Sequence, residues 1–345
     1  MNPTITTLLL LSLVLGTTIT ISSSHWLLAW AGLEMSTLAI TPIISKQHHP
    51  RATEAATKYF LTQATASTLI LFSSSINAWK TGQWDISQLS APESTIMLTL
   101  ALAIKLGLAP MHFWLPEVLQ GSTLPTAMII VTWQKLAPMS LLLLTTNSLN
   151  HKTLITMGLL SALLGGWAGL NQTQTRKIMA FSSIAHMGWL FMALTTTPNI
   201  TLVTLFIYLL LTTAMFSTLI TTTSKTLLDL GTSSHQTPNI LTISMLTLMS
   251  LGGLPPLTGF MPKWLILSTL TMNNMLLIST ILALSTLPSL FFYLRMSQMT
   301  TLTLPPKTLL SGHTWRFKTS IPLVAPTIIL STLLLPITPL ISNLT

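Results

Sequence analysis

The sequence predicts an all-α, polytopic membrane protein with about eleven transmembrane helices. Only 6% of its 345 residues are charged, whereas a soluble globular chain carries about 25% charged residues. The mean hydropathy is +0.69. Apolar runs of about 18 or more residues, each long enough to cross a hydrocarbon core roughly 30 Å thick, recur from end to end. Lipid is therefore the expected solvent for most of the chain.

Apolar runs and the polar breaks between them place each helix. No Lys or Arg precedes the first run, Leu8–Ile21, and no small-residue cleavage site follows it, so we expect a retained helix and not a signal peptide. The expected helices are 3–22, 25–45, 57–79, 93–121, 123–146, 152–171, 175–196, 200–223, 239–271, 274–296 and 321–342. The longest polar connections are 46–56, 80–92, 224–238 and 297–320. None is long enough for a second folded unit, so we expect residues 1–345 to form a single membrane domain.

Positive charges sort to one side of this topology. If the N-terminus lies on the side of insertion, ten Lys and Arg residues fall in the loops and helix ends of that side: Lys46, Arg51, Lys58, Arg176, Lys177, Lys225, Arg295, Lys307, Arg316 and Lys318. The opposite side holds only Lys80 and Lys152. Lys and Arg accumulate on the side of insertion. The asymmetry supports both the orientation and the odd number of helices.

An internal repeat interrupts two of the expected helices. The segment 93–121 contains Gly107, then Pro110, Pro116 and Glu117, and the segment 239–271 contains Gly253 followed by Pro256, Pro262 and Lys263 at the same spacing. Proline removes a helical hydrogen bond, so both helices should be broken. Broken helices at membrane depth are buried in protein or line a hydrated cavity. The two segments cross in opposite directions, which is the arrangement of an inverted repeat in a transporter; a chance match of common Gly and Pro residues is the alternative.

One acid at mid-depth of an early helix, Glu34, and three lysines, Lys105, Lys135 and Lys263, fall inside apolar runs. A charge at the centre of a membrane helix costs about 2.5–3.5 kcal/mol, so such residues face the bundle interior and mark ion or proton paths. The proton affinity of a buried lysine depends on whether a carboxylate lies near it. We therefore expect Glu34 to pair with Lys105, Lys135 to carry a proton at mid-depth, and Lys263 to be the last relay.

Structural roles remain open for the same residues. A Glu34–Lys105 pair can serve only to fix helix packing, and Lys263 can extend along its helix to the membrane surface. His112 and His186 are further relay candidates, as is Glu117 beside the first break, although each histidine can equally be a hydrogen-bonded interior residue.

Several kinds of site are not expected. The chain has no Cys, which excludes disulfides and iron–sulfur ligation by its own thiolates. Nucleotide-binding glycine motifs are absent, as are a nucleophile elbow and the basic stripe of a nucleic-acid-binding protein. The adjacent His48 and His49 have no acids at metal-ligand spacing, so no metal site is expected.

Three motifs resemble one family. KLGLAPMHFWLPE at 105–117, RKIMAFSSIAHMG at 176–188 and GGLPPLTGFMPK at 252–263 are similar, in this order, to the antiporter-like subunits of respiratory complex I. The resemblance covers essentially the whole chain. It implies the antiporter-like fold with inverted repeats, and one proton-translocating channel in which Glu34 matches the acid, Lys105 its partner, Lys135 the central carrier and Lys263 the terminal one.

The resemblance also implies a setting for the chain. FMN, the iron–sulfur clusters and NADH oxidation would belong to partner subunits, with no cofactor in this chain. Its partners would be other complex I subunits, including neighbouring antiporter-like ones, and membrane lipids. The location would be the mitochondrial inner membrane, with the N-terminus in the matrix and the C-terminus in the intermembrane space. Bacterial members have fourteen helices, so the first three would be missing here.

Two other functions fit the same sequence features. One is a secondary transporter that exchanges a cation for protons, since the fold and the charged axis would serve it equally well. The other is a membrane scaffold in which buried charges only hold helices together. An antiporter would move ions without NADH, and a scaffold would tolerate loss of Lys135.

Overall fold

The structure is a computed structural model, and it describes residues 3–47, 49–233, 238–301 and 324–333. All regular elements in these ranges are helices. The chain divides into two compact units, Met1–Ser161 and Ala162–Thr345, which are described separately below. Each expected membrane segment contains helix. The last one, 321–342, is described only over its central part, and Lys307, Arg316 and Lys318 lie outside the described residues.

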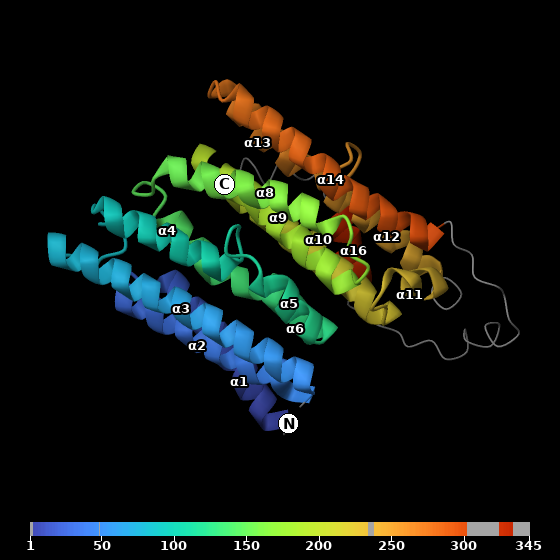
Figure 1. Cartoon of the computed structure of the whole chain (residues 1–345), viewed down its shortest axis with the longest axis horizontal. Helices are drawn as coiled ribbons and strands as arrows, with labels where there is room; N and C mark the ends of the chain where they lie inside the picture. Colours follow the sequence, from blue (N-terminus) through green and yellow to red (C-terminus); the bar gives the residue numbers. More distant parts are fainter. Residues whose placement is uncertain (1–2, 48, 234–237, 302–323, 334–345) are drawn as a thin grey trace, which may run out of the picture. The chain divides into compact units, whose positions relative to one another are not determined.

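The first unit begins with three long helices that pack side by side (Figure 1). Its elements are α1 (Pro3–Ser22), α2 (Trp26–Ile44), the 3₁₀ turn η1 (Ser45–Gln47), α3 (Pro50–Thr81), α4 (Pro92–Leu106), α5 (Trp114–Gly121), α6 (Leu124–Val131), η2 (Trp133–Lys135), α7 (Leu136–Leu144) and most of α8 (His151–Gly169). Gly16 and Gly32 let α1 and α2 touch, since a Cβ on either would lie 2.7 Å from the other's carbonyl oxygen. Such close approach is typical of membrane helix pairs.

The second unit is built around α9 (Thr175–Thr196), which is almost entirely buried. Its other elements are the end of α8, then α10 (Pro198–Thr222), α11 (Leu227–Thr232), α12 (Pro238–Gly252), α13 (Phe260–Met272), α14 (Leu276–Thr301) and α16 (Val324–Leu333). α9 packs against α10, α13 and α14. It also approaches α8 closely, because Gly165 lies against the backbone of Ala185.

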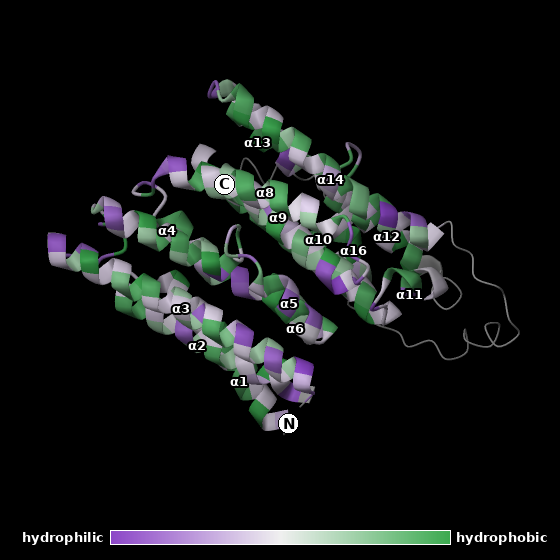
Figure 2. Ribbon diagram, viewed as in Figure 1, coloured by the Kyte–Doolittle hydropathy of each residue, from purple (hydrophilic) through white to green (hydrophobic). Residues whose placement is uncertain are grey.

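The outer surface of the helices is apolar, as a lipid-facing surface must be. Figure 2 shows hydrophobic residues along the length of most helices. Large apolar side chains are exposed there, including Leu8, Phe72 and Trp167. Six described spans are both long and apolar enough to cross a membrane: Pro3–Ser22, Trp26–Ile44, Leu124–Leu144, Thr175–Thr196, Pro198–Thr222 and Leu276–Thr301. The expectation of a polytopic membrane protein is confirmed.

Both expected helix interruptions are present, and they have the same backbone geometry. α4 ends at a left-handed Gly107 (φ 75°) and α12 at a left-handed Gly253 (φ 81°). In each case the glycine N–H donates to the carbonyl three residues earlier, and the next N–H donates to the carbonyl five residues earlier. This is a glycine-terminated C-cap. The helix then resumes seven residues later, at Trp114 and Phe260. The repeat is therefore present in the backbone structure as well as in the sequence.

A second pair of matching features lies in the connections. In the first unit, His25, between α1 and α2, forms an isolated antiparallel bridge with Asp85, between α3 and α4. In the second unit, Gln174, between α8 and α9, forms the same bridge with Thr226, which follows α10. Each bridge joins the connection before one helix, α2 or α9, to the connection after the next helix, α3 or α10. The repeated bridges extend the internal repeat beyond the proline motifs.

Three local expectations were wrong. The segment 123–146 is not one helix, because η2 divides it. The connection 46–56 is helical from Pro50, because proline suits the first helical position. The Nδ1 of His49 caps this helix by accepting a hydrogen bond from the Arg51 N–H at 3.2 Å. The connection 224–238 contains α11, which begins with a capping box between Thr226 and Asp229.

The capping box also sets the charge of Asp229. Partial burial acts to raise the pKa of this carboxyl, but the backbone N–H groups of Thr226 and Lys225, at 2.8 and 3.0 Å, more than offset it and hold the pKa below its ordinary value. The carboxylate is therefore ionised at neutral pH and stabilises the start of α11.

Candidate functional site

Glu34 lies on α2, and two hydroxyl groups donate hydrogen bonds to its carboxylate. Ser67 Oγ, from α3, is 2.6 Å from Oε1, and Thr37 Oγ1 is 3.0 Å from Oε2. Each hydroxyl also has a backbone carbonyl at 2.9 Å, that of Ala64 for Ser67 and that of Glu34 itself for Thr37. A hydroxyl has only one proton to donate. Both can therefore turn to a carbonyl when Glu34 is protonated, so the site satisfies either protonation state.

Lys105 lies in the last turn of α4, directly before the first break. Its side chain is only 6% exposed, and its Nζ has no hydrogen-bond partner in the protein. Glu34 acts electrostatically on Lys105 and on Tyr59. The two nevertheless form no direct ion pair; the ion pairs among the described residues join Lys58 to Glu54 and Glu117, and Lys80 to Glu93. The acid and the lysine are coupled without touching.

Lys135 lies inside the break that sequence analysis missed. Its side chain is 2% exposed, and its backbone belongs to η2, between α6 and α7. Pro138 accounts for the break, because it has no N–H and its ring conflicts with the carbonyl of Gln134, four residues earlier. The Gln134 side-chain amide donates to the Ser36 carbonyl at 3.2 Å. The break is thus tied to α2 two residues beyond Glu34.

His112 and Glu117, the two relay candidates near the first break, occupy different environments. His112 is buried, its Nδ1 is 3.3 Å from the Pro110 carbonyl, and its ring stacks on Phe113. Glu117 is exposed and accepts a hydrogen bond from Lys58 at 2.7 Å. Lys58 bonds Glu54 as well, at 2.6 Å, and this bond holds the pKa of Glu54 below its ordinary value. The structure therefore places Glu117 in a surface ion network.

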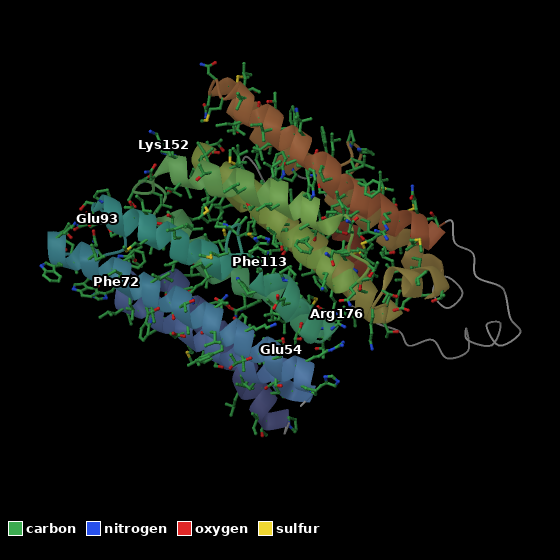
Figure 3. The ribbon with its side chains drawn as sticks, viewed as in Figure 1. Glu54, Phe72, Glu93, Phe113, Lys152 and Arg176 are labelled. Atoms are coloured by element: carbon green, nitrogen blue, oxygen red, sulfur yellow. The ribbon has the colours of Figure 1, made fainter. Side chains whose placement is uncertain are left out.

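The ion pairs of the first unit mark two polar ends. Glu54 is near the start of α3, whereas Glu93, which pairs with Lys80 of α3, is at the start of α4; Figure 3 shows the two glutamates at opposite ends of the helices, with Phe72 between them. Phe72 is exposed at 54%. The apolar middle between the two charged ends is the part of α3 that faces lipid.

In the second unit, Lys263 points back into the break that precedes it. Its Nζ donates to the Gly252 carbonyl, which ends α12, at 2.7 Å, and lies 6.0 Å from the centre of the Trp189 ring. Gly253 makes room for the side chain, since a Cβ there would lie 2.8 Å from Lys263 Cδ. In this structure the lysine is held by the break and does not extend to a surface.

His186 and Lys263 line one small cavity. The cavity has a volume of about 30 Å³, enough for one or two water molecules, and its polar lining includes Thr204 and Tyr208. His186 Nε2 is 3.4 Å from the Tyr293 hydroxyl, and its ring lies 5.7 Å from that of Tyr208. Two protonatable groups therefore meet at a site with room for water.

Several of these contacts could not be read from the sequence. Ser67, Thr37 and the tyrosines around His186 are too common in the chain to stand out. The break at Lys135 did have a signal, because Pro138 follows the buried lysine by less than one helical turn. None of the described residues form a cluster suited to a metal ion.

The fold and the buried groups together define a class. The chain is a multi-pass membrane protein in which Lys105, Lys135 and Lys263 each lie at a break in a helix. Buried lysines at interrupted helices are typical of ion-translocating proteins.

Comparison with known proteins identifies the family. Residues 23–288 match the NADH:quinone oxidoreductase/Mrp antiporter membrane family, and residues 290–342 match the C-terminal family of NADH dehydrogenase subunit 2. NADH-ubiquinone oxidoreductase chain 2 of Sibirionetta formosa is 57% identical over 344 residues, covering 99% of both chains. The chain belongs to the NADH:quinone oxidoreductase/Mrp antiporter family.

Solved structures agree with this assignment. A chain of respiratory complex I from Thermus thermophilus, solved with bound aureothin, aligns over 98% of this chain and 79% of its own length, with 26% identity and a TM-score of 0.86. A chain of the Mrp complex of a Dietzia species aligns over 97% of this chain and 75% of its own, with a TM-score of 0.76. At 16% identity the latter likeness concerns the fold alone.

Proposed function

We propose that this chain is a membrane-arm subunit of proton-translocating NADH:ubiquinone oxidoreductase, respiratory complex I, in the mitochondrial inner membrane. The observation that carries the translocation role is that the buried Lys105 and Lys135 and the half-buried Lys263 each lie at a helix break. A break frees backbone carbonyls and loosens packing, so water can enter beside the lysine. The complex itself is indicated by relatives that match the chain over its full length.

In this proposal the chain moves protons and carries out no redox chemistry. Electrons pass from NADH to ubiquinone on other subunits, which hold FMN and the iron–sulfur clusters. Glu34, Lys105 and Lys135 serve in the first unit and Lys263 in the second, with His186 and His112 as relays, and residues 1–345 act as one antiporter-like domain. Glu117 has a weaker claim to a relay role, because it is exposed and already paired with Lys58.

We further propose that the N-terminus faces the matrix and the C-terminus the intermembrane space. The charge distribution supports this orientation. In the first unit Arg51 and Lys58 lie at the start of α3, whereas Lys80 alone lies at its other end. In the second unit Arg176 begins α9, Lys225 follows α10, and Arg295, near the end of α14, donates to the Leu170 carbonyl at 3.1 Å.

The assignment is tested by gentle extraction from the native membrane and separation of the assemblies by size. We expect the chain to migrate with a very large complex that has rotenone-sensitive NADH:quinone reductase activity. Migration in a small complex that exchanges cations for protons without NADH would instead establish the antiporter alternative.

We expect the Glu34→Gln variant to slow coupled NADH oxidation about tenfold while leaving the complex assembled, because the interaction between residue 34 and Lys105 is weakened. A tenfold change in rate corresponds to roughly 1.4 kcal/mol. The amide keeps the size of the side chain but neither takes up a proton nor carries charge. The measurement is turnover and proton yield in sealed vesicles. Glu93→Gln is the control, because this exposed carboxylate contributes little. Unchanged turnover and yield in assembled Glu34→Gln complex would contradict the role of Glu34.

We expect the Gly253→Ala variant to impair translocation because the new Cβ would lie 2.9 Å from Lys263 Nζ. The lysine must then leave the Gly252 carbonyl, and we expect proton transfer to slow about tenfold, the effect of losing roughly one hydrogen bond to a charged group. Gly82→Ala is a matched control: its φ of 72° imposes the same backbone strain, but no atom lies within 4 Å of the added carbon. Equal proton yields in the two variants would show that the position of Lys263 is unimportant.

A further inference from the structure

One face of α3 carries three polar residues toward the interior of the first unit. Tyr59, Gln63 and Ser67 follow one another at intervals of four residues, so they share one face of the helix. They are 1%, 4% and 0% exposed. Ser67 bonds Glu34 directly, and Glu34 acts electrostatically on Tyr59 and on Lys105. This face therefore adjoins Glu34. It also reaches the end of α4 that carries Lys105, because the Tyr59 ring lies 5.8 Å from that of Trp114, whose indole N–H donates to the Ile104 carbonyl.

Five buried donors among the described residues have no partner in the protein: the Trp26 and Trp30 indole N–H groups on α2, and three that belong to this face of α3 or to Lys105. The Tyr59 hydroxyl, the Gln63 Nε2 and the Lys105 Nζ are all buried and make no hydrogen bond to another protein atom. A buried donor without an acceptor is costly, and native proteins satisfy almost all such groups. In a membrane interior the available partner for clustered donors is bound water. Three together indicate a hydrated site and not an isolated packing defect.

A second buried amide on the same helix provides a contrast. Asn77 is 0% exposed, and its Nδ2 donates to the Gln88 carbonyl at 3.0 Å while its Oδ1 accepts from the Ser90 N–H at 3.3 Å. It fastens the connection between α3 and α4 to the helix. The nitrogen and the oxygen of the Asn77 amide thus both have hydrogen-bond partners in the protein. The nitrogen of the Gln63 amide has no such partner. Hydrogen bonds to the connection between α3 and α4 account for the buried Asn77 amide, whereas no protein group satisfies the Gln63 Nε2.

We propose that Tyr59, Gln63 and Ser67 hold a water-filled connection through which a proton passes between Lys105 and Glu34. The proton leaves the Lys105 ammonium for water, successive O–H bonds break and form along the connection, and the Ser67 hydroxyl gives its proton to Glu34 Oε1 while accepting one from water. An ammonium and a carboxylate become an amine and a carboxylic acid, so total charge is unchanged. Gln63 and Tyr59 are positioning residues. This proposal rests on the proposed function and adds the route between its first two groups.

Hydroxyl-radical footprinting of the intact complex tests the water directly and does not depend on activity. Radicals formed from bound water oxidise the side chains that contact it. We expect Tyr59 to be oxidised several-fold faster than Phe292, an aromatic residue that is equally buried, at 1% exposure, in the second unit. In the Gln63→Leu variant the Tyr59 rate should fall toward that of Phe292. Equal rates in the unmodified complex would overturn the proposal.

The functional test compares the two buried amides. Gln63→Leu removes a donor that has no protein partner, so the complex should assemble normally, while coupled turnover and proton yield should fall about tenfold. Asn77→Leu removes paired groups, so the amount of complex should fall, while the proton yield of what remains is unchanged. Gln63→Asn retains an amide and should restore at least half of the yield.

The outcomes separate this proposal from the one on which it rests. Loss of assembly in Gln63→Leu, or a normal proton yield in that variant, overturns the α3 connection even if Lys135 and Glu34 prove essential. Absence of NADH:quinone activity from every fraction that contains the unmodified chain overturns the proposed function, whatever the footprinting shows at Tyr59.

Discussion

Replacing Lys135 by methionine should abolish proton translocation without preventing assembly of the complex. The side chain is 2% exposed within the break between α6 and α7, where methionine can occupy similar space without a charge. Methionine is unbranched and adapts to irregular interior space, and the variant no longer buries a group that can carry charge. A missing proton carrier, in contrast, typically costs about 10²–10⁴ in rate. The expected loss of proton yield is therefore at least a hundredfold on this estimate.

The measurement is the number of protons moved per NADH oxidised in sealed vesicles, with native electrophoresis to quantify the complex. Lys152→Met is the matched control, because this lysine is exposed at the start of α8 and should tolerate the change. A normal proton yield in assembled Lys135→Met complex would refute the carrier role. It would favour instead the scaffold interpretation, in which buried charges only hold helices together.

The largest structural effect is expected from Gly259→Ala. Gly259 precedes α13, and a Cβ there would overlap the carbonyl group of Ser250 in α12. The Ser250 carbonyl belongs to the backbone, and the position of a Cβ is fixed by the backbone that carries it, so no rotamer change relieves the overlap. The end of α12 and the start of α13 must therefore move apart. Overpacking costs typically about 1–3 kcal/mol and sometimes more, and this case lies at the severe end. We expect little or no assembled complex.

Gly252→Ala is the control within the same break. A Cβ at Gly252 meets its nearest neighbours at 3.8 and 4.0 Å, which is ordinary contact, and alanine favours the helix that ends there. Immunodetection of the chain in native gels measures both variants. Equal amounts of complex in the two would mean that the break accommodates a side chain at Gly259, contrary to the observed packing.

Local features were well predicted where a residue acts through its own backbone. Gly107 and Gly253 end helices because glycine adopts the left-handed conformation at low cost, and the prolines that follow prevent the helix from continuing. The break at Lys135 was missed although Pro138 signals it. A proline inside a helix can produce a bend or an interruption, and the Gln134 contact with Ser36, on another helix, accompanies the interruption seen here.

The sequence by itself determined the membrane-spanning class, the two glycine-ended breaks and the presence of an acid and three lysines within membrane segments, because composition and hydropathy reflect transfer of each residue into lipid. Only the tertiary structure decided which groups meet. Glu34 was expected to pair with Lys105, yet its hydrogen bonds come from Ser67 and Thr37. The rotation of each helix about its axis depends on packing against its neighbours, such as the glycine contact between α1 and α2. That rotation selects the face of α3 that adjoins the acid.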